Sequence, residues 1–210
     1  DDEGYISPTA TKIILDFSTE RKITSIAFGC GISTELCTKI FTERFLLKNK
    51  VPIVIDADGL NNIQKNIKVL KKMESNTVIT PHPAELSRLM KISISDIQKN
   101  REKIAKKFAA EYGLICILKG FETVISDGKD IFVNTTGNPG MATGGTGDAL
   151  TGMIAAFIGQ TDSLLDAACL GVYLHGLAGD LAAKEKTQIS MLPSDLIEKI
   201  PEAIKSIIVS

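Results

Sequence analysis

Residues Gly137–Asp148, with the sequence GNPGMATGGTGD, combine dense glycine with a terminal carboxylate. Because Gly144, Gly145 and Gly147 lack a Cβ atom, successive backbone N–H groups can converge on one anion. The apolar run ALTGMIAAFI follows and predicts a buried helix, whose N-terminus adds unpaired donors and the positive end of its dipole. The dipole favours the ionised form of Asp148, which we interpret as a general base. The density of glycine favours this interpretation over the alternative, a helix cap that follows a simple turn.

Other polar residues follow predicted strands. In DADGLN, Asp56 and Asp58 are two carboxylates that suit Mg²⁺ bound through water, a polyhydroxyl ligand or a simple capping cluster. His82, in TPHPAE, lies between two prolines that fix the backbone around its imidazole, although a single His is more often structural. Lys119 ends the run LICILK and Gly120 follows it. We expect them to place a cation and a flexible residue beside the glycine-rich loop Gly137–Asp148, which we call the anion loop.

Two further motifs have simpler interpretations. GCG at Gly29–Gly31 either lets the backbone approach a ligand or forms a tight turn after a strand. His175 lies in the Gly- and Ala-rich run YLHGLAGDLAA, and we assign it to packing. Three glycines in and next to this run are expected to allow close helix contact: Gly171, Gly176 and Gly179.

Composition indicates one globular domain with small-molecule partners. The chain has 210 residues, 44% of them hydrophobic, and its 24 basic and 25 acidic side chains give no electrostatic footprint for nucleic acid. We expect no apolar run long enough to cross a membrane and no signal peptide. The four cysteines lack CxxC spacing, which favours reduced thiols in a cytoplasmic protein over zinc binding or disulfides.

Alternating strands and helices predict how these residues are positioned. Strands are expected at Ile23–Phe28, Val51–Asp56, Thr77–Thr80 and Leu114–Lys119, followed by a hairpin of Thr123–Ser126 and Asp130–Val133. Helices are expected at Ser33–Leu47, from Leu60, and at Ala84–Met90, Ser95–Tyr112, Thr146–Ile158, Ser163–Lys184 and Pro193–Ile207. The pattern predicts a single α/β domain with a mostly parallel sheet, helices on both faces, and ligands at the carboxyl ends of the strands.

In order along the chain, DADGLN, TPHPAE, LKGFETVI, GNPGMATGGTGD and HGLAGD resemble the ADP- or ATP-dependent NAD(P)H-hydrate dehydratases of the ribokinase-like superfamily. The resemblance extends from about Gly29 to the C-terminus. It implies a ribokinase-like catalytic domain with the activity of a lyase that repairs hydrated NADH or NADPH. The implied cofactors are ADP or ATP, as the phosphoryl donor, and Mg²⁺. It also implies a cytoplasmic homo-oligomer of four or more subunits.

The resemblance also implies roles for single residues. It places Gly31, His82 and Asn138 at the hydrated dinucleotide and Asp148 at the reacting hydroxyl. No residue is assigned as a metal ligand. The adenine nucleotide is expected at Lys119, Gly120, Phe121, Glu122, Thr123, Gly144, Gly145, Thr146 and Gly147.

The sequence departs from the family pattern in three places. GCGIS replaces the usual GPGLG, and Ala84 replaces a usual Gly. Family members also begin with a strand, a glycine-rich loop and an Ala-rich helix that contribute to the substrate pocket. We expect domain 1–210 to lack this segment, so that the chain is a fragment or the pocket wall comes from elsewhere. Two other functions stay open: a kinase of a small alcohol or vitamin precursor, and a nucleotide-binding regulator without turnover.

Overall fold

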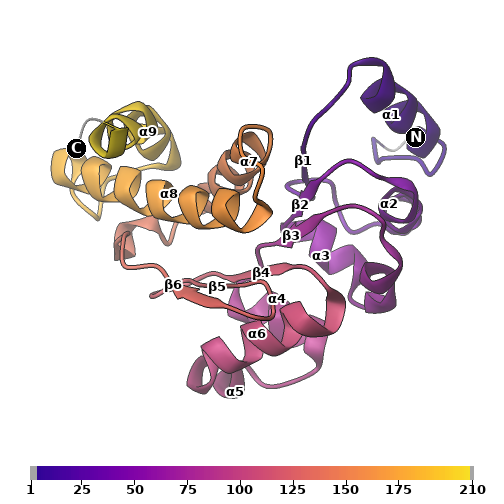
Figure 1. Cartoon of the computed structure of the whole chain (residues 1–210), viewed down its shortest axis with the longest axis horizontal. Helices are drawn as coiled ribbons and strands as arrows, with labels where there is room; N and C mark the ends of the chain where they lie inside the picture. Colours follow the sequence, from indigo (N-terminus) through magenta and orange to yellow (C-terminus); the bar gives the residue numbers. More distant parts are fainter. Residues whose placement is uncertain (1–3, 209–210) are drawn as a thin grey trace.

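The computed structural model describes residues 4–208, which form a six-stranded sheet with helices on both faces (Figure 1). The strands lie in chain order: β1 Ile26–Phe28, β2 Ile53–Ile55, β3 Thr77–Ile79, β4 Ile115–Leu118, β5 Val124–Ser126 and β6 Ile131–Val133. Strands β1 to β4 are parallel, and β5 and β6 are added as an antiparallel hairpin. The predicted mostly parallel sheet is therefore confirmed.

The helices connect the strands and then complete the chain. The α-helices are α1 Ala10–Glu20, α2 Leu36–Lys48, α3 Ala57–Ile63, α4 Pro83–Met90, α5 Ile94–Lys99, α6 Arg101–Tyr112, α7 Thr146–Ile158, α8 Leu164–Lys186 and α9 Pro193–Ile208. Two short 3-10 helices are η1 Ile67–Lys72 and η2 Pro139–Met141.

Buried strand residues alternate between two apolar cores. Ile53 and Ile55 pack on the face that α2, α3 and α6 help to cover, whereas Val54 packs on the opposite face with Leu150 of α7 and Val172 of α8. Helix α9 lies on α8, away from the sheet (Figure 1). Because a strand presents alternate side chains to opposite faces, continuous apolar runs such as IVI need cover on both sides.

The N-terminal helix α1 is the main element that the sequence patterns did not predict. Its buried residues, Thr11 and Ser18, are polar, whereas Ile13 and Phe17 are 69% and 52% exposed. Ala10, Ile14 and Leu15 are partly buried and pack against the core, so the inward face of α1 is apolar at helical spacing; the sequence analysis assigned no element to this run.

Other elements differ from the predictions mainly at their ends. The single helix predicted for Ser95–Tyr112 is two helices, because Asn100 adopts φ −136° and ψ 37° between α5 and α6. Ser93 caps α5 by accepting a hydrogen bond from the Asp96 amide at its hydroxyl, so the helical region begins before the predicted Ser95. Helix α3 begins at Ala57, earlier than the predicted Leu60, and a 2.9 Å hydrogen bond from the Gly59 amide to the Asp56 carbonyl closes its first turn.

Helix α8 is longer and more apolar than the sequence analysis expected. Among residues 4–208, α8 is the one helix long and apolar enough to cross a membrane: it has 23 residues and a mean hydropathy of 1.2 over its most apolar window. Half of that window is buried inside the protein, and α8 packs against both α7 and α9. We therefore interpret α8 as a core helix.

The predicted close approach at the α8 glycines is confirmed most clearly at Gly176. A Cβ atom there would lie 2.2 Å from Thr136 Oγ1 and 2.7 Å from the Thr136 carbonyl carbon. At Gly171 and Gly179 the nearest atoms belong instead to the flexible side chains of Ile154 and Met141. Gly176 thus lets the loop before the glycine-rich stretch lie directly on α8.

Gly176→Ala should lower the free energy of unfolding by about 2 kcal/mol or more, because backbone atoms of Thr136 cannot move aside as a side-chain end does. Gly152→Ala, in the interior of α7, is the matched control, because its Cβ atom would meet nothing within 4 Å. That control should be neutral or stabilising by up to about 1 kcal/mol. Chemical denaturation of the two variants measures both values, and equal stabilities would contradict the packing argument.

Candidate active site

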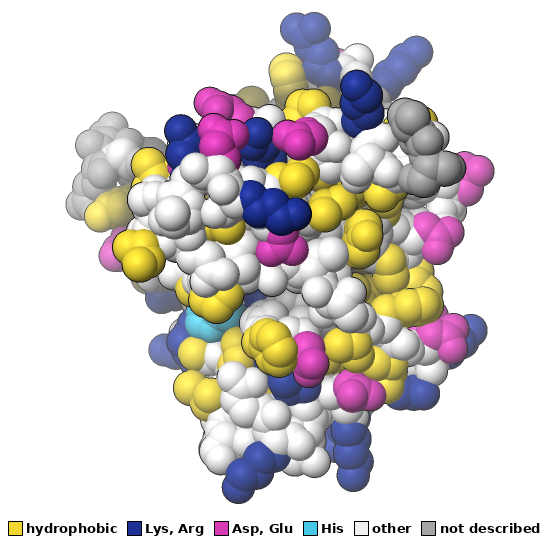
Figure 2. All heavy atoms as spheres, turned by 90° about the vertical axis from the view of Figure 1, so that its left-hand side faces the viewer, with side chains coloured by type: hydrophobic (Ala, Val, Ile, Leu, Met, Phe, Trp, Pro, Cys, Tyr) yellow, Lys and Arg dark blue, Asp and Glu magenta, His cyan; other side chains and the backbone are white. Residues whose placement is uncertain are grey.

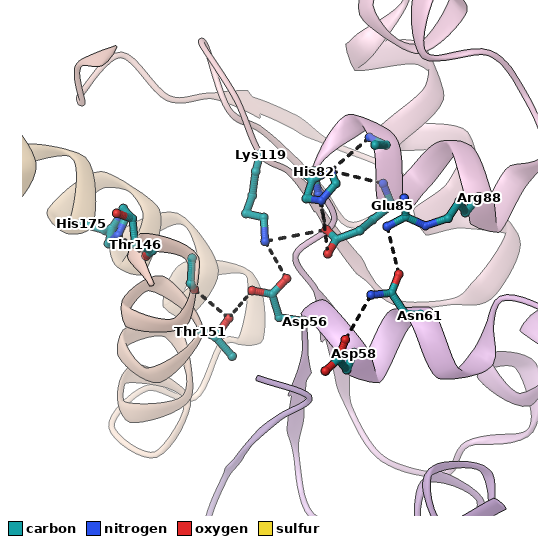
Figure 3. Close-up of polar contacts among 12 residues, drawn as sticks. Asp56, Asp58, Asn61, His82, Glu85, Arg88, Lys119, Thr146, Thr151 and His175 are labelled. Atoms are coloured by element: carbon teal, nitrogen blue, oxygen red, sulfur yellow. Dashed lines mark hydrogen bonds and ion pairs between the residues drawn. The ribbon is translucent and has the colours of Figure 1, made fainter. Parts of the chain in front are cut away.

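The candidate site lies where the carboxyl ends of β2 and β4 meet the start of α7. Asp56, directly after β2, is 1% exposed, and its carboxylate lies 2.6 Å from Lys119 Nζ after β4. The other carboxylate oxygen lies 3.0 Å from the hydroxyl of Thr151 on α7. Figure 3 shows these three side chains pointing toward one another. The ion pair therefore ties two strand ends to α7.

The glycine-rich loop brings the N-terminus of α7 over this ion pair. Gly145 precedes the helix with φ +93°, a conformation that favours glycine. Gly147 lies in the first helical turn, where a Cβ atom would be 3.4 Å from Lys119 Nζ. The first backbone bond in the helix runs from the Ala149 amide to the Gly145 carbonyl, so the amides of Gly147 and Asp148 have no acceptor among residues 4–208. These amides and the ammonium group form a site suited to an anion.

The three glycines Gly144, Gly145 and Gly147 differ in backbone conformation and surroundings. Only Gly145 of the three has a positive φ. Gly144 is exposed, and a Cβ atom there would meet no protein atom within 4 Å. A Cβ atom on Gly145 would lie 3.4 Å from Pro193 Cγ, so protein atoms lie beside both Gly145 and Gly147, and the approach of the loop to an anion stays a prediction.

Asp148 is exposed in the first turn of α7, as its predicted role as a base requires. Its carboxylate, the Asp56 carboxylate and Cys30 Sγ each have an atom within 4.8 Å of the others. Burial, a hydrogen bond from the thiol to Asp148 and the charges of Asp148 and Asp56 raise the pKa of Cys30 to about 12. The thiol therefore stays protonated at neutral pH and donates to Asp148.

The sequence analysis did not predict that Cys30 reaches the site. Its only signal was position, since Cys30 lies between two glycines directly after a predicted strand. Gly29 is fixed by packing: it has φ +117°, and a Cβ atom would lie 2.0 Å from the Asp56 carbonyl oxygen. Gly31, predicted at the substrate, has φ +67° and open space around it. GCG is thus a tight turn at Gly29 that leaves Gly31 accessible.

His82 begins α4 and is joined to the ion pair through Glu85. Its Nδ1 accepts hydrogen bonds from the amides of Ala84 and Glu85, so the neutral ring carries its proton on Nε2. Burial, with a smaller effect from the Lys119 charge, lowers the pKa of His82. Glu85 accepts a 2.7 Å bond from the His82 amide and lies 3.9 Å from Lys119 Nζ. Nε2 of this half-exposed ring lies 3.5 Å from Glu85 Oε1, so a polar substrate can compete with Glu85 for its proton.

The two carboxylates of DADGLN have separate roles. Asp56 is occupied by Lys119 and Thr151, and Asp58 accepts a 3.0 Å bond from the Ser33 amide. Asp58 also accepts from Asn61 at 3.4 Å. Asp58 therefore ties the first turn of α3 to the loop before α2, and magnesium binding by these carboxylates stays a prediction.

Two other predicted regions lie on loops around the site. Asn138 uses its side-chain amide for the Gly179 carbonyl and the Asp180 carboxylate, and its side-chain oxygen accepts from the Gly140 amide. This set of contacts joins the loop to α8, so its substrate role stays a prediction. The turn from Gly120 to Thr123 follows β4 at the same edge of the sheet.

His175, which the sequence analysis assigned to packing, supports the anion loop from below. It is 7% exposed, and its Nε2 lies 3.0 Å from the carbonyl oxygen of Thr146, the first residue of α7 (Figure 3). Because a carbonyl oxygen only accepts, Nε2 carries the proton. Burial lowers the pKa of His175 to about 4.

The fold and this strand-end site define a ribokinase-like protein. A ribokinase-like superfamily protein from Enterococcus faecalis matches with a TM-score of 0.80 and 28% identity, over 96% of this chain and 69% of that one. The ADP/ATP-dependent NAD(P)H-hydrate dehydratase from Bacillus subtilis, co-crystallised with ATP and Mg²⁺, matches with a TM-score of 0.77 and 31% identity. That match covers 87% of this chain and 64% of the enzyme.

Sequence comparison identifies the family. A family model described as NAD(P)H-hydrate dehydratase matches residues 5–202. The bifunctional NAD(P)H-hydrate repair enzyme Nnr of Moorella thermoacetica is 40% identical over 206 residues, which are 97% of this chain. The chain therefore belongs to the NAD(P)H-hydrate dehydratase family, as its motifs predicted. It spans 38% of the length of the Moorella relative.

The low pKa of His175 predicts an acid-sensitive fold. Below pH 6.5 His175 is protonated in the unfolded chain, whereas in the folded protein it stays neutral down to about pH 4. The free energy of unfolding therefore decreases as the pH falls from 6.5 to about 4. The loss should be about 1.4 kcal/mol per pH unit for this residue. His175→Gln keeps an amide donor and should lose less stability between pH 6.5 and 5 than the wild type in chemical denaturation. Parallel pH dependences would contradict this prediction.

Proposed function

We propose that the protein uses ADP or ATP to dehydrate hydrated NADH or NADPH. The observation that carries the proposal is the exposed Asp148 carboxylate at the mouth of an anion loop that has Lys119 Nζ directly beneath Gly147. A base beside a phosphate site is what transfer of a phosphoryl group to a hydroxyl requires. The names of the family and of the Bacillus relative supply the substrate class.

The proposed reaction has two parts. Asp148 takes the proton from the ring hydroxyl while the hydroxyl oxygen bonds to the terminal phosphorus of the nucleotide. The bond between that phosphorus and the rest of the nucleotide breaks, and its electron pair goes to the departing nucleotide. The ring C–O bond then breaks, and inorganic phosphate leaves with that pair, assisted by the ring nitrogen lone pair. Loss of a neighbouring ring proton forms the double bond of the dihydronicotinamide. Phosphorylation is needed because hydroxide is a poor leaving group at neutral pH.

The charges of the site support a requirement for Mg²⁺ with the nucleotide. Asp56, Asp148 and Glu85 are acidic, whereas the cation Lys119 pairs with Asp56 and lies 3.9 Å from Glu85. A nucleotide phosphate chain would add further negative charge. Asp148 offers a carboxylate, so Mg²⁺ held mainly by the phosphates fits this donor set, and it would neutralise charge on the phosphates. A protonated Cys30 thiol is a poor magnesium ligand, which argues against a metal cage built by the protein alone.

The alternatives of a kinase and a regulator receive less support. Both would use the same anion loop, but the family model and the similar proteins from Moorella and Bacillus carry dehydratase or repair names. No contact of the site specifically favours a reaction that stops at a phosphorylated product. We therefore keep dehydration as the proposed activity.

We further propose a cytoplasmic homo-oligomer of four or more subunits. The four cysteines are free, which suits a reducing compartment. Strand β6 is an edge strand whose outer side has no partner strand among residues 4–208; Phe132 and Val133 on it are exposed, and so is Tyr173 on α8. Hydrophobic side chains gather along the right of the face in Figure 2. Light scattering should give a mass several times 22.6 kDa, and a monomer mass would contradict the proposal.

Hydrated NADH lacks one ring double bond and therefore the near-ultraviolet absorbance of NADH. Incubation of the protein with hydrated NADH, Mg²⁺ and ADP or ATP should restore this absorbance and release inorganic phosphate in equal amount. A kinase would consume nucleotide without restoring absorbance, and a regulator would consume nothing. Equal dehydration without nucleotide would contradict the phosphorylation mechanism.

The same assay tests the base. Asp148→Asn should lower turnover by about two to four orders of magnitude, the usual contribution of a positioned base, while nucleotide still binds. Asp162→Asn, an exposed change in the turn between α7 and α8, should leave turnover unchanged. Near-wild-type turnover of Asp148→Asn would show that Asp148 only caps α7.

A further inference from the structure

Arg101, the first residue of α6, reaches across to the turn that follows β4. Its Nη2 atom lies 2.9 Å from the Leu118 carbonyl oxygen, 3.3 Å from that of Lys119 and 3.5 Å from that of Glu122. Its Nη1 atom donates to Gln98 at 3.0 Å. One guanidinium group thus contacts carbonyls on both sides of the turn Gly120–Glu122.

The turn itself has an unusual backbone. Gly120 has φ +137°, and Glu122 has φ +52°, a region that non-glycine residues rarely adopt. A Cβ atom on Gly120 would lie 3.3 Å from Arg101 Nη1, so the guanidinium packs directly against the glycine. At the tip, Phe121 is 89% exposed and receives little support from packing. The contacts of Arg101 therefore offset the cost of this backbone conformation.

The burial of Arg101 indicates that these contacts are specific. Arg101 is partly buried, and this burial lowers its pKa, with an opposing effect from Glu122. Its Nε atom is buried without a hydrogen-bond partner among residues 4–208. Removing a charged group from water is unfavourable unless hydrogen bonds replace the water, and here backbone carbonyls do so for Nη2 and Gln98 does so for Nη1.

Two of the three carbonyls that Arg101 contacts belong to Leu118 and Lys119, and the Lys119 side chain lies beside Gly147 of the anion loop. The Lys119 carbonyl is held by Arg101, and the Lys119 amide donates to the Pro81 carbonyl at 2.9 Å. Both sides of the Lys119 backbone are therefore fixed, while its side chain extends to Asp56. Arg101 thus acts on the point where the turn and the anion loop meet.

We infer that Arg101 is a positioning residue for the adenine nucleotide. It holds residues 119–123 in the conformation that binds the nucleotide, without contacting the reacting hydroxyl. The inference rests on the proposed function, because that turn is expected to bind ADP or ATP. Loss of Arg101 should weaken nucleotide binding while the chemical step stays intact.

The test compares Arg101→Met and Arg101→Lys with the wild type. Arg101→Met keeps an apolar stem, whereas Arg101→Lys keeps the charge but loses the planar fork that reaches several carbonyls. We expect KM and the calorimetric Kd for ADP with Mg²⁺ to rise about tenfold in Arg101→Met, which is the scale of one hydrogen bond to a charged group. The rise should be smaller in Arg101→Lys. The value of kcat at saturating nucleotide and KM for hydrated NADH should change by less than about twofold. Arg21→Lys, an exposed change at the end of α1, is the control.

The outcomes separate this inference from the proposed function. Unchanged nucleotide affinity in a folded variant, even with a lower Tm, would show that Arg101 only stabilises the turn and would overturn the inference. A lower kcat at unchanged KM would also overturn it. If Arg101→Met does not fold, Arg101→Lys decides by the same criteria. A wild-type protein that binds neither nucleotide would contradict the proposed function, and with it the basis of this inference.

Discussion

The structure depends most on the buried ion pair between Lys119 and Asp56. Asp56 is 1% exposed, so its carboxylate needs a partner, and Lys119 and Thr151 occupy its two oxygens. These contacts bring together β2, β4 and α7, which are far apart in the sequence. Since Thr151 lies one helical turn after Gly147, the ion pair also fixes where the first turn of α7 begins.

Fixing α7 in this way gives the site its chemistry. The anion loop, the Asp148 carboxylate and the Cys30 thiol all lie around the same strand ends. His175 supports the loop from α8 through the Thr146 carbonyl, and Glu85 approaches Lys119 from α4. A nucleotide phosphate chain would therefore meet the amides of the loop and the partly buried Lys119 ammonium, with the proposed base Asp148 beside them.

The sequence predicted much of this arrangement because chemistry follows strand ends in α/β folds. Asp56, His82, Lys119 and Asp148 each follow a predicted strand or begin a predicted helix, and the structure brings them to one edge. The pairing of Lys119 with Asp56 could not be predicted, because either carboxylate of DADGLN satisfied the same pattern. Arg101 could not be predicted either, because its partners are backbone carbonyls, which every residue has.

The central claim is that Lys119, held by Asp56, provides the cation of the nucleotide site. Calorimetric titration of ADP and Mg²⁺ into the double variant Lys119→Met/Asp56→Asn tests it most directly, because that variant removes both charges and leaves no unpaired buried carboxylate. The account predicts an affinity lower than wild type by about tenfold or more, while Lys129→Met on the exposed β5–β6 turn leaves it unchanged. Wild-type affinity in the folded double variant would contradict the account.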